Sequence, residues 1–181
     1  VADDGQFGSA LVLSGFNYDR GYNTGVELHA KYVNGNFRAY GNLAWGRQRA
    51  RGPSSNQYLF DTDEYPYVAT HYIYTDHAQT LTASAGASYK WNDTRISMDM
   101  IYASGLRAGF ANTAKVSPYA QVNAGLAHDL KGATGKPLTL RVDVVNLFDR
   151  VYQIRDGSGI GVFAPQYGPR RSIYAGVTQK F

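Results

Sequence analysis

Acidic residues and histidines gather in one stretch of the chain, residues 49–77, and are its main candidates for chemistry. Carboxylate oxygens are the ligands that hard cations prefer, and a histidine among carboxylates can bind a transition metal. The candidates are Asp61, Asp63, Glu64, His71, Asp76 and His77. Their spacing matches no metal-binding loop motif, so we predict no metal site and no cofactor. The residues interpreted as ligand or loop contacts are Asp61, Asp63, His71 and His77.

The adjacent pair Asp76-His77 is the arrangement that most suggests a catalytic acid or base. Neighbouring side chains of a strand point to opposite faces, however, and no nucleophile is placed beside this pair. We therefore predict no catalytic residue and no enzymatic activity. The glycines at 157, 159 and 161 precede no helix, so they predict tight turns and not a phosphate-binding loop.

The composition indicates one domain with a membrane-interface character. The 181 residues contain no linker, so we predict a single region over residues 1–181. Cysteine is absent, which excludes disulfides and thiolate metal sites. The net charge of +4 is mild and its cations are dispersed, which argues against a nucleic-acid groove. The 15 tyrosines suit a membrane interface, because each ring has one polar and one apolar end.

Alternating apolar and polar residues, the pattern of a strand with one apolar face, run along most of the chain. The clearest run has Leu81, Ala83 and Ala85 alternating with threonine and serine. The strands predicted in this way, about eight in number, cover residues 9–18, 24–33, 36–48, 79–91, 94–104, 119–130, 138–145 and 170–181. No helical period extends over 11 residues, so we predict an all-β chain.

The connections between these strands alternate in length. Short turns follow the second, fourth and sixth strands, at residues 34–35, 92–93 and 131–136. Long loops follow the third, fifth and seventh, at residues 49–77, 105–118 and 149–169, and only residues 19–23 follow the first. This alternation is typical of a transmembrane antiparallel up-and-down β-barrel, whose strands cross with about 9–11 residues. The alternative is a soluble β-sandwich or lipocalin-like barrel. In such folds no physical constraint makes short and long connections alternate along the chain.

Motifs in the last third of the chain resemble a known family. The sequence Asn146-Leu147-Phe148-Asp149 follows a strand with Arg141 and Asp143, and a final strand ends at the aromatic Phe181. Other segments that match are Tyr152, 155–157, 159–161, 168–171, 25–27, Asp76-His77 with Gln79, and 104–107. Together they resemble the C-terminal β-barrel portion of TonB-dependent outer-membrane receptors, over nearly the whole chain.

The resemblance implies a barrel of about 22 strands whose lumen holds an N-terminal plug. No segment here matches the plug or the box that contacts TonB, so the chain is interpreted as the last strands of a larger barrel. The alternative is a self-closed barrel of about eight strands, filled by side chains, with a structural or adhesion role. Inward charges that suit either architecture are Glu27, Lys31, Arg38, Lys90, Arg95, Asp99, Arg141 and Asp143.

The function implied by the resemblance is import of a scarce nutrient (a siderophore, cobalamin, metal chelate or oligosaccharide) through the outer membrane of a Gram-negative bacterium. The implied partners are outer-membrane lipid and lipopolysaccharide, the remaining barrel strands and the plug domain, TonB acting through the plug, the barrel-assembly machinery, and a small-molecule ligand. The last strand is similar to the signal that this machinery reads, although Gln179 stands where an apolar or aromatic residue is usual. That signal is carried by Tyr174, Gly176 and Phe181.

The loop at residues 149–169 is the most distinctive stretch. Further candidate ligand or loop contacts are Arg107, Arg155 and Tyr167. The loop also carries the apolar residues Ile160, Val162, Phe163 and Tyr167, so we expect it to fold inward over the lumen and to contact inward side chains. We expect Asp149 and Asp156 to pair with the nearby arginines.

Overall fold

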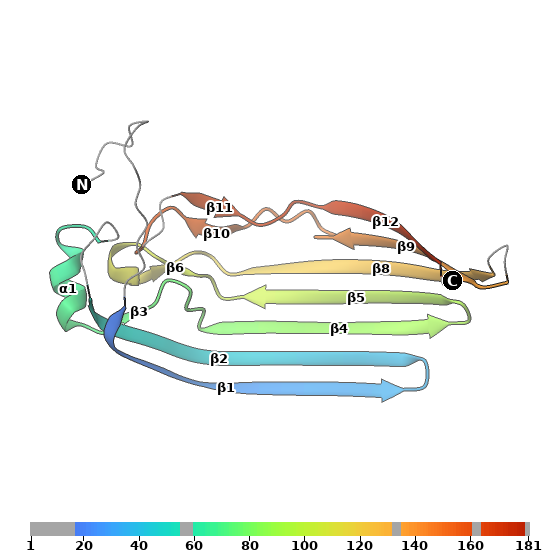
Figure 1. Cartoon of the computed structure of the whole chain (residues 1–181), viewed down its shortest axis with the longest axis horizontal. Helices are drawn as coiled ribbons and strands as arrows, with labels where there is room; N and C mark the ends of the chain where they lie inside the picture. Colours follow the sequence, from blue (N-terminus) through green and yellow to red (C-terminus); the bar gives the residue numbers. More distant parts are fainter. Residues whose placement is uncertain (1–16, 55–59, 132–134, 161–163, 180–181) are drawn as a thin grey trace.

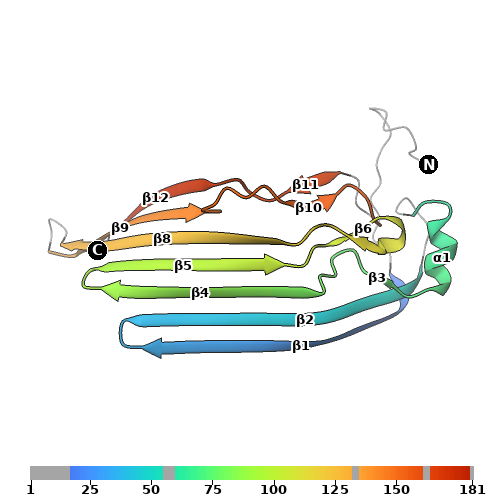
Figure 2. The same ribbon diagram turned by 180° about the vertical axis from the view of Figure 1, so that it is seen from behind.

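One antiparallel sheet forms most of the protein (Figures 1 and 2). The computed structural model describes residues 17–54, 60–131, 135–160 and 164–179. The strands of the sheet, in spatial order, are β1 (Tyr18–Asn34), β2 (Phe37–Pro53), β4 (Leu81–Trp91), β5 (Thr94–Ala103), β8 (Tyr119–Lys131), β9 (Pro137–Val145) and β12 (Ser172–Gln179). The short strand β3 (Ile73–Tyr74) also pairs with β2. The prediction of an all-β chain built from antiparallel strands is confirmed.

The strand register places apolar residues on one face of the sheet and polar residues on the other. One row crosses all seven strands through the consecutive partners Tyr32, Ala39, Ala87, Met98, Ala124, Val144 and Ile173. A slip of one residue in any pair would mix the two faces. The apolar face is open, with Met98 52% and Val177 68% exposed. A contiguous exposed apolar face of this kind marks a surface that contacts a membrane or another protein.

The opposite face is polar and forms side-chain hydrogen bonds between strands. Asn42 donates to Ser84 Oγ at 2.9 Å, and Asn123 donates to Asp99 Oδ2 at 2.7 Å. Arg141 and Asp143 lie two residues apart on this face and form a salt bridge at 2.6 Å. Among the described residues, no helix has both the length and the apolar character needed to cross a membrane.

Two-residue turns join the strands at one end of the sheet. Trp91 pairs with Thr94 across Asn92-Asp93, as predicted. Asn34 pairs with Phe37, so that turn consists of Gly35 and Asn36, one residue later than predicted. Gly35 has φ +56°, a conformation that costs glycine little. Residues 132–134, in the third predicted turn, lie outside the described residues.

The predicted turn at residues 19–23 is wrong. The strand β1 runs without interruption from Tyr18 to Asn34, and its ladder with β2 extends as far as Tyr18 opposite Pro53. Gly21, Asn23 and Gly25 resemble turn residues, but pairing with β2 satisfies their backbone and overrides that preference. The predicted strand at residues 9–18 lies almost entirely outside the described residues.

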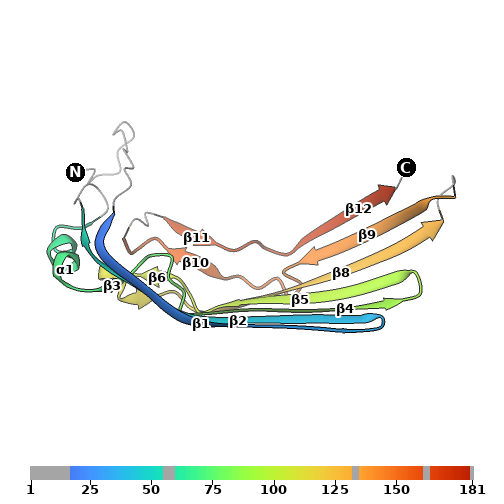
Figure 3. The ribbon, with the colours of Figure 1, turned by 60° about the horizontal axis from the view of Figure 1, so that its bottom comes forward.

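The long connections gather at the other end of the sheet (Figures 1 and 3). They fold into α1 (Glu64–Thr70), β6 (Arg107–Ala108), η1 (Phe110–Asn112), β7 (Ala114–Lys115), β10 (Gln153–Asp156) and β11 (Pro165–Tyr167). The prediction of loops alone missed this short helix, because seven residues are too few to show a helical period. Val68, Ile73, Ala111 and Ile160 form a small buried core between the loops.

Two buried polar side chains join these loops to one another. Asn112 donates to the Tyr74 carbonyl oxygen at 3.0 Å and accepts from the Ile160 N–H at 3.1 Å. Glu64 accepts from the Ala111 N–H at 2.6 Å. Buried polar groups are stable only when they are hydrogen-bonded, so these bonds fix three loops relative to each other.

The sheet is curved and open (Figure 3). Within the described residues, β1 and β12 are its two edges and do not pair with each other. This part of the chain therefore shows a curved wall and not the self-closed barrel that the sequence left open as an alternative.

Candidate functional site

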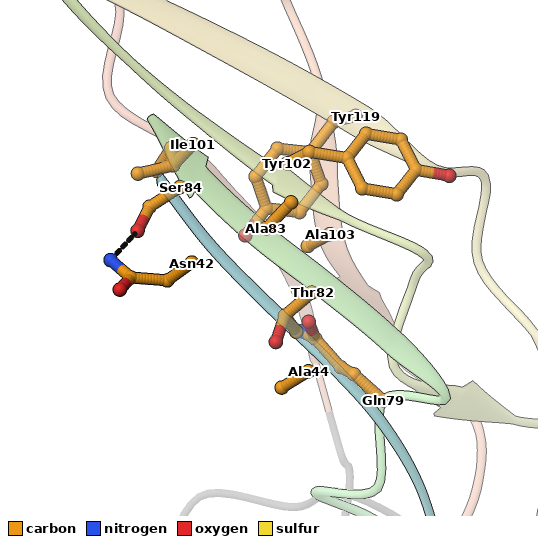
Figure 4. A pocket seen from close by; sticks show the side chains of 10 residues that line it. All are labelled: Asn42, Ala44, Gln79, Thr82, Ala83, Ser84, Ile101, Tyr102, Ala103 and Tyr119. Atoms are coloured by element: carbon orange, nitrogen blue, oxygen red, sulfur yellow. Dashed lines mark hydrogen bonds between the residues drawn. The ribbon is translucent and has the colours of Figure 1, made fainter. Parts of the chain in front are cut away.

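A hollow of mixed polar and apolar lining lies on the polar face of the sheet, which we call its inner face, close to the loop end (Figure 4). It is lined by side chains from β2, β4, β5 and the start of β8, including Asn42, Thr82, Ser84 and Tyr119. A second hollow shares Ala44, Gln79 and Thr82 with it and extends toward β1 through Asn23, Glu27, Gln48 and His77. The two hollows therefore adjoin, and we call them together the groove; their lining includes amide and hydroxyl groups and the carboxylate of Glu27.

The most polar cluster at the rim of this groove joins Asp76, His77 and Arg155. Nδ1 of His77 lies 2.8 Å from the Asp76 carboxylate, and Nη2 of Arg155 lies 2.8 Å from Nε2 of His77. Arg155 also reaches Asp76 at 3.4 Å. A guanidinium can only donate, so Nε2 must accept and Nδ1 must carry the proton. The imidazole is thereby oriented by a carboxylate on one side and a guanidinium on the other.

The expectation that Asp76 and His77 point to opposite faces is wrong. Residues 75–77 form a turn, closed by the Ala78 N–H donating to the Thr75 carbonyl at 3.0 Å, and in a turn the two side chains can meet. Among the described residues, the side-chain hydrogen bonds of His77 go to Asp76 and Arg155, neither of which is a nucleophile. Its chemistry is that of a hydrogen-bonding and charged contact.

Arg107 has a supporting role beneath the groove. Its side chain is buried and donates to the Ala78 carbonyl at 3.2 Å and to Thr80 Oγ1 at 2.6 Å. The guanidinium also lies 3.5 Å from the centre of the Tyr74 ring. Arg107 therefore holds the segment that carries His77 and is a loop contact.

The other predicted contacts lie apart from this cluster. Asp61 and Asp63 precede α1, and His71 ends it, with its ring stacked 4.2 Å from that of Tyr67. Tyr167 lies exposed on β11. The described residues contain no group of three or more acidic or histidine side chains placed to hold a metal.

Asn146 holds the base of the last loop. Its side chain is 1% exposed and donates to two carbonyl oxygens, those of Arg150 and Pro169, both at 2.9 Å. The side-chain oxygen accepts from the Arg150 N–H at 3.0 Å, and the Asn146 N–H donates to Asn123 Oδ1 at 3.0 Å. Its φ of +52° lies in the left-handed region that asparagine tolerates better than most residues.

Asp149 also stabilises the base of the last loop, through residues at the far end of that loop. It accepts from Arg170 at 2.8 and 2.6 Å and from the Arg171 N–H at 2.9 Å. These hydrogen bonds, Arg170 first, hold the pKa of the Asp149 carboxyl well below its usual range. The predicted pairing of Asp149 with an arginine is confirmed. That of Asp156 is not, because it accepts from Ser158 at 2.8 Å.

The loop packs inward at Ile160, as expected, and also at Tyr152, which the expectation did not name. The same expectation is wrong for Tyr167, which is 61% exposed on β11. Tyr152 is buried, stacks on Tyr119 with ring centres 4.1 Å apart, and donates to Gln121 Oε1 at 2.7 Å. Burial raises the pKa of the Tyr152 hydroxyl. Ile160 joins the loop core. Val162 and Phe163, which the expectation also named, lie outside the described residues.

Gly168 is the position at which this packing is most sensitive. A Cβ added to Gly168 would lie 2.0 Å from the Tyr152 ring, so Gly168→Ala must displace that ring. We expect faster amide hydrogen exchange across β10 and β11 in the variant, by tenfold or more, because losing such packing costs about 1–3 kcal/mol. Gly41→Ala, which adds a Cβ in open space on β2, is the control. Unchanged exchange in Gly168→Ala would contradict the packing role of Tyr152.

The predicted assembly signal lies only partly in the described residues. Tyr174 pairs with Asp143 and Gly176 with Arg141, so both lie on the polar face of β12. Phe181 lies outside the described residues. The role of these residues in assembly stays a prediction.

Solved structures of outer-membrane receptors and transporters share this fold. The siderophore receptor PiuA from Acinetobacter baumannii matches 88% of the chain with a TM-score of 0.66 at 16% identity. The unliganded ferric citrate transporter FecA matches 88% with a TM-score of 0.66 at 20% identity, and the copper transporter OprC 89% with 0.60 at 19%. No protein-family model and no curated protein sequence matches the chain.

These matches confirm, for the fold, the resemblance to the barrel of TonB-dependent receptors. The chain spans only 22% of PiuA and 24% each of FecA and OprC. It therefore has the fold of one section of such a barrel wall, with loops at one end.

Proposed function

We propose that this chain forms barrel wall and extracellular loops of an outer-membrane receptor that imports a scarce nutrient. The observation that carries the proposal is a single sheet with one exposed apolar face, one polar face, and all its long loops at one end. In a barrel this arrangement turns the apolar face to lipid and the polar face to the lumen. The open edges β1 and β12 would then pair with the remaining strands of a larger barrel.

The groove and the cluster at its rim are the parts proposed to meet the ligand. Asp76, His77 and Arg155 present a carboxylate, an imidazole and a guanidinium, a set that suits a polar ligand with anionic groups such as a metal chelate. Siderophores, cobalamin, metal chelates and oligosaccharides are the candidate ligand classes. The plug and TonB would supply the coupling to energy.

Uptake by the whole receptor tests this proposal. Cells that express it should take up one of four labelled probes (a ferric siderophore, cobalamin, a copper chelate or a maltooligosaccharide) only when TonB is present. Arg155→Ala should weaken binding of that probe about tenfold, because it removes a charged hydrogen bond worth about 1.5–3 kcal/mol. Arg150→Ala removes the same charge from an exposed position in the same loop and should change binding little. The proposal is refuted if the cells take up none of the probes, or if uptake is the same with and without TonB.

A further inference from the structure

A chain of side-chain hydrogen bonds runs along the inner face of β8 toward the loop end of the sheet. Tyr152 of the last loop donates its hydroxyl hydrogen to Gln121 Oε1 at 2.7 Å, and Gln121 Nε2 donates to Asn123 Oδ1 at 2.8 Å. Asn123 Nδ2 then donates to Asp99 Oδ2 at 2.7 Å. Gln121 and Asn123 are alternate residues of one strand, so both point to the same face. The chain therefore joins the last loop to the wall through three consecutive bonds.

The direction of these bonds follows from one backbone group. The Asn146 N–H lies 3.0 Å from the Asn123 side chain and can only donate, so the atom of Asn123 that faces it must be the amide oxygen. The amide nitrogen of Asn123 then faces the Asp99 carboxylate, which accepts. Gln121 must direct its own amide nitrogen at the Asn123 oxygen, which leaves Gln121 Oε1 to accept from Tyr152. A flip of either amide would set two acceptors against each other.

Asn123 is the residue at which two supports of the last loop meet. Asn146, which holds the base of that loop, bonds Asn123 directly, and Tyr152, which packs inside the loop, bonds it through Gln121. Gln121 is 6% and Tyr152 8% exposed, so little water reaches their bond. A buried polar chain stabilises a structure when each of its members is satisfied. Both supports of the loop therefore depend on the orientation of the Asn123 amide.

Asp99, which fixes that orientation, belongs to the wall and not to the loops. It lies in the middle of β5, between Gly86 of β4 and Asn123 of β8. Four residues separate it from the end of β5 at Ala103, which corresponds to about 13 Å at about 3.3 Å per residue. Within the described residues Asp99 forms no salt bridge, whereas Asp143 on the same face pairs with an arginine. Its hydrogen bond with Asn123 is therefore the contact on which its carboxylate acts.

We propose that Asp99 positions the last loop from within the wall. Its carboxylate orients Asn123, and Asn123 in turn holds Asn146 and, through Gln121, Tyr152. The order of the β10–β11 hairpin thus depends on Asp99, although three hydrogen bonds separate Asp99 from Tyr152. A cationic group that reached Asp99 from the polar side of the wall would compete with Asn123 and loosen the loop. The inference goes beyond the proposed transport role, because it concerns a coupling between the wall and the loop.

Amide hydrogen exchange of the full-length receptor, in neutral-detergent micelles at pH 8, tests this positioning role. N123D keeps the shape of the side chain and the oxygen that accepts from Gln121 and from the Asn146 N–H, but it replaces the donor that faces Asp99 with a second carboxylate oxygen. Two facing carboxylates repel each other. The amides of the β10–β11 hairpin should therefore exchange about tenfold or more faster than in the wild type.

The exchanged pair D99N/N123D restores the same bond in the opposite direction. The amide at position 99 donates to the carboxylate at position 123, which still accepts from Gln121 and from the Asn146 N–H. The net charge equals that of the wild type. Exchange in the hairpin should return to within about threefold of the wild-type rate, since the two changes are coupled through one contact. D99N alone keeps an oxygen that accepts from Asn123 and should fall between the wild type and N123D.

D143N is the matched control, because it removes a carboxylate that lies on the same face but bonds Arg141. It should leave exchange in the hairpin unchanged, and the amides of the β1–β2 ladder report any general loss of stability. The inference is overturned if N123D exchanges as the wild type does, or if D99N/N123D or D143N exchanges as fast as N123D. Where N123D does not fold, recovery of the folded form in D99N/N123D decides in the same way. Uptake tests transport separately, so a receptor that imports its ligand but shows no such coupling refutes only this inference.

Discussion

Replacing Asn146 with alanine is expected to destabilise the folded barrel by about 3 kcal/mol and to release the last loop. The side chain is fully buried and makes three hydrogen bonds to the backbone of Arg150 and Pro169. Its loss leaves buried backbone groups without partners, each at a cost of about 1–3 kcal/mol. Alanine also tolerates the observed φ of +52° less well than asparagine. The free energy of unfolding is measured by titrating the full-length receptor with urea. The folded fraction at each urea concentration is read from the difference in gel mobility between unheated and heated samples.

Two further variants separate the contributions to this effect. Asn146→Asp keeps the shape, the tolerance of positive φ and the acceptor for the Arg150 N–H, but loses both N–H donors; it should show most of the loss. Asn42→Ala removes a half-buried asparagine that donates one bond to Ser84 and contacts the exposed His29 ring through its Oδ1, so about 1–2 kcal/mol is expected. If Asn146→Ala costs no more than Asn42→Ala, Asn146 does not hold the base of the loop.

The sequence was sufficient to predict the two faces of the sheet. A period of two residues assigns each side chain to a face, and the short turn at Asn92-Asp93 fixes the register of the strands beside it. The seven predicted strands from residue 24 onward therefore correspond to strands of the sheet. The failure at residues 19–23 has a physical cause. Local turn preference at Gly21 and Asn23 is weak compared with a ladder that continues to Pro53.

The candidate site could be predicted only in part, because its contacts join residues far apart in the sequence. Arg155 and His77 are 78 positions apart, and no local pattern relates them. Glu64 looked like a metal ligand among other acids, yet it is buried and accepts from the Ala111 backbone. The motif containing Asn146 and Asp149 was visible in the sequence. Its physical role needed the structure, since its main partners, Pro169 and Arg170, lie at the far end of the loop.

Arginine substitutions in the middle of β4 should have opposite outcomes at neighbouring positions. Ala85 is exposed on the apolar face, where its partners are Gly41 and Met100. Ala85→Arg places a charge at the depth of the hydrocarbon and should cost about 2–4 kcal/mol of barrel stability. Leu126→Arg, on the same face of β8, should cost a similar amount.

Ser84→Arg is the matched control, because it adds the same charge one residue away. Ser84 lies on the polar face of the sheet beside Asn42 (Figure 4), where water and polar groups are expected to solvate a guanidinium. Its cost should stay below about 1 kcal/mol, the value for substitutions without a buried charge. Refolding of the full-length receptor into lipid vesicles across a urea series compares the three variants. The physical reason for the difference is the environment of each face and not the strand itself, so equal losses at Ser84 and Ala85 would mean that the apolar face does not meet lipid.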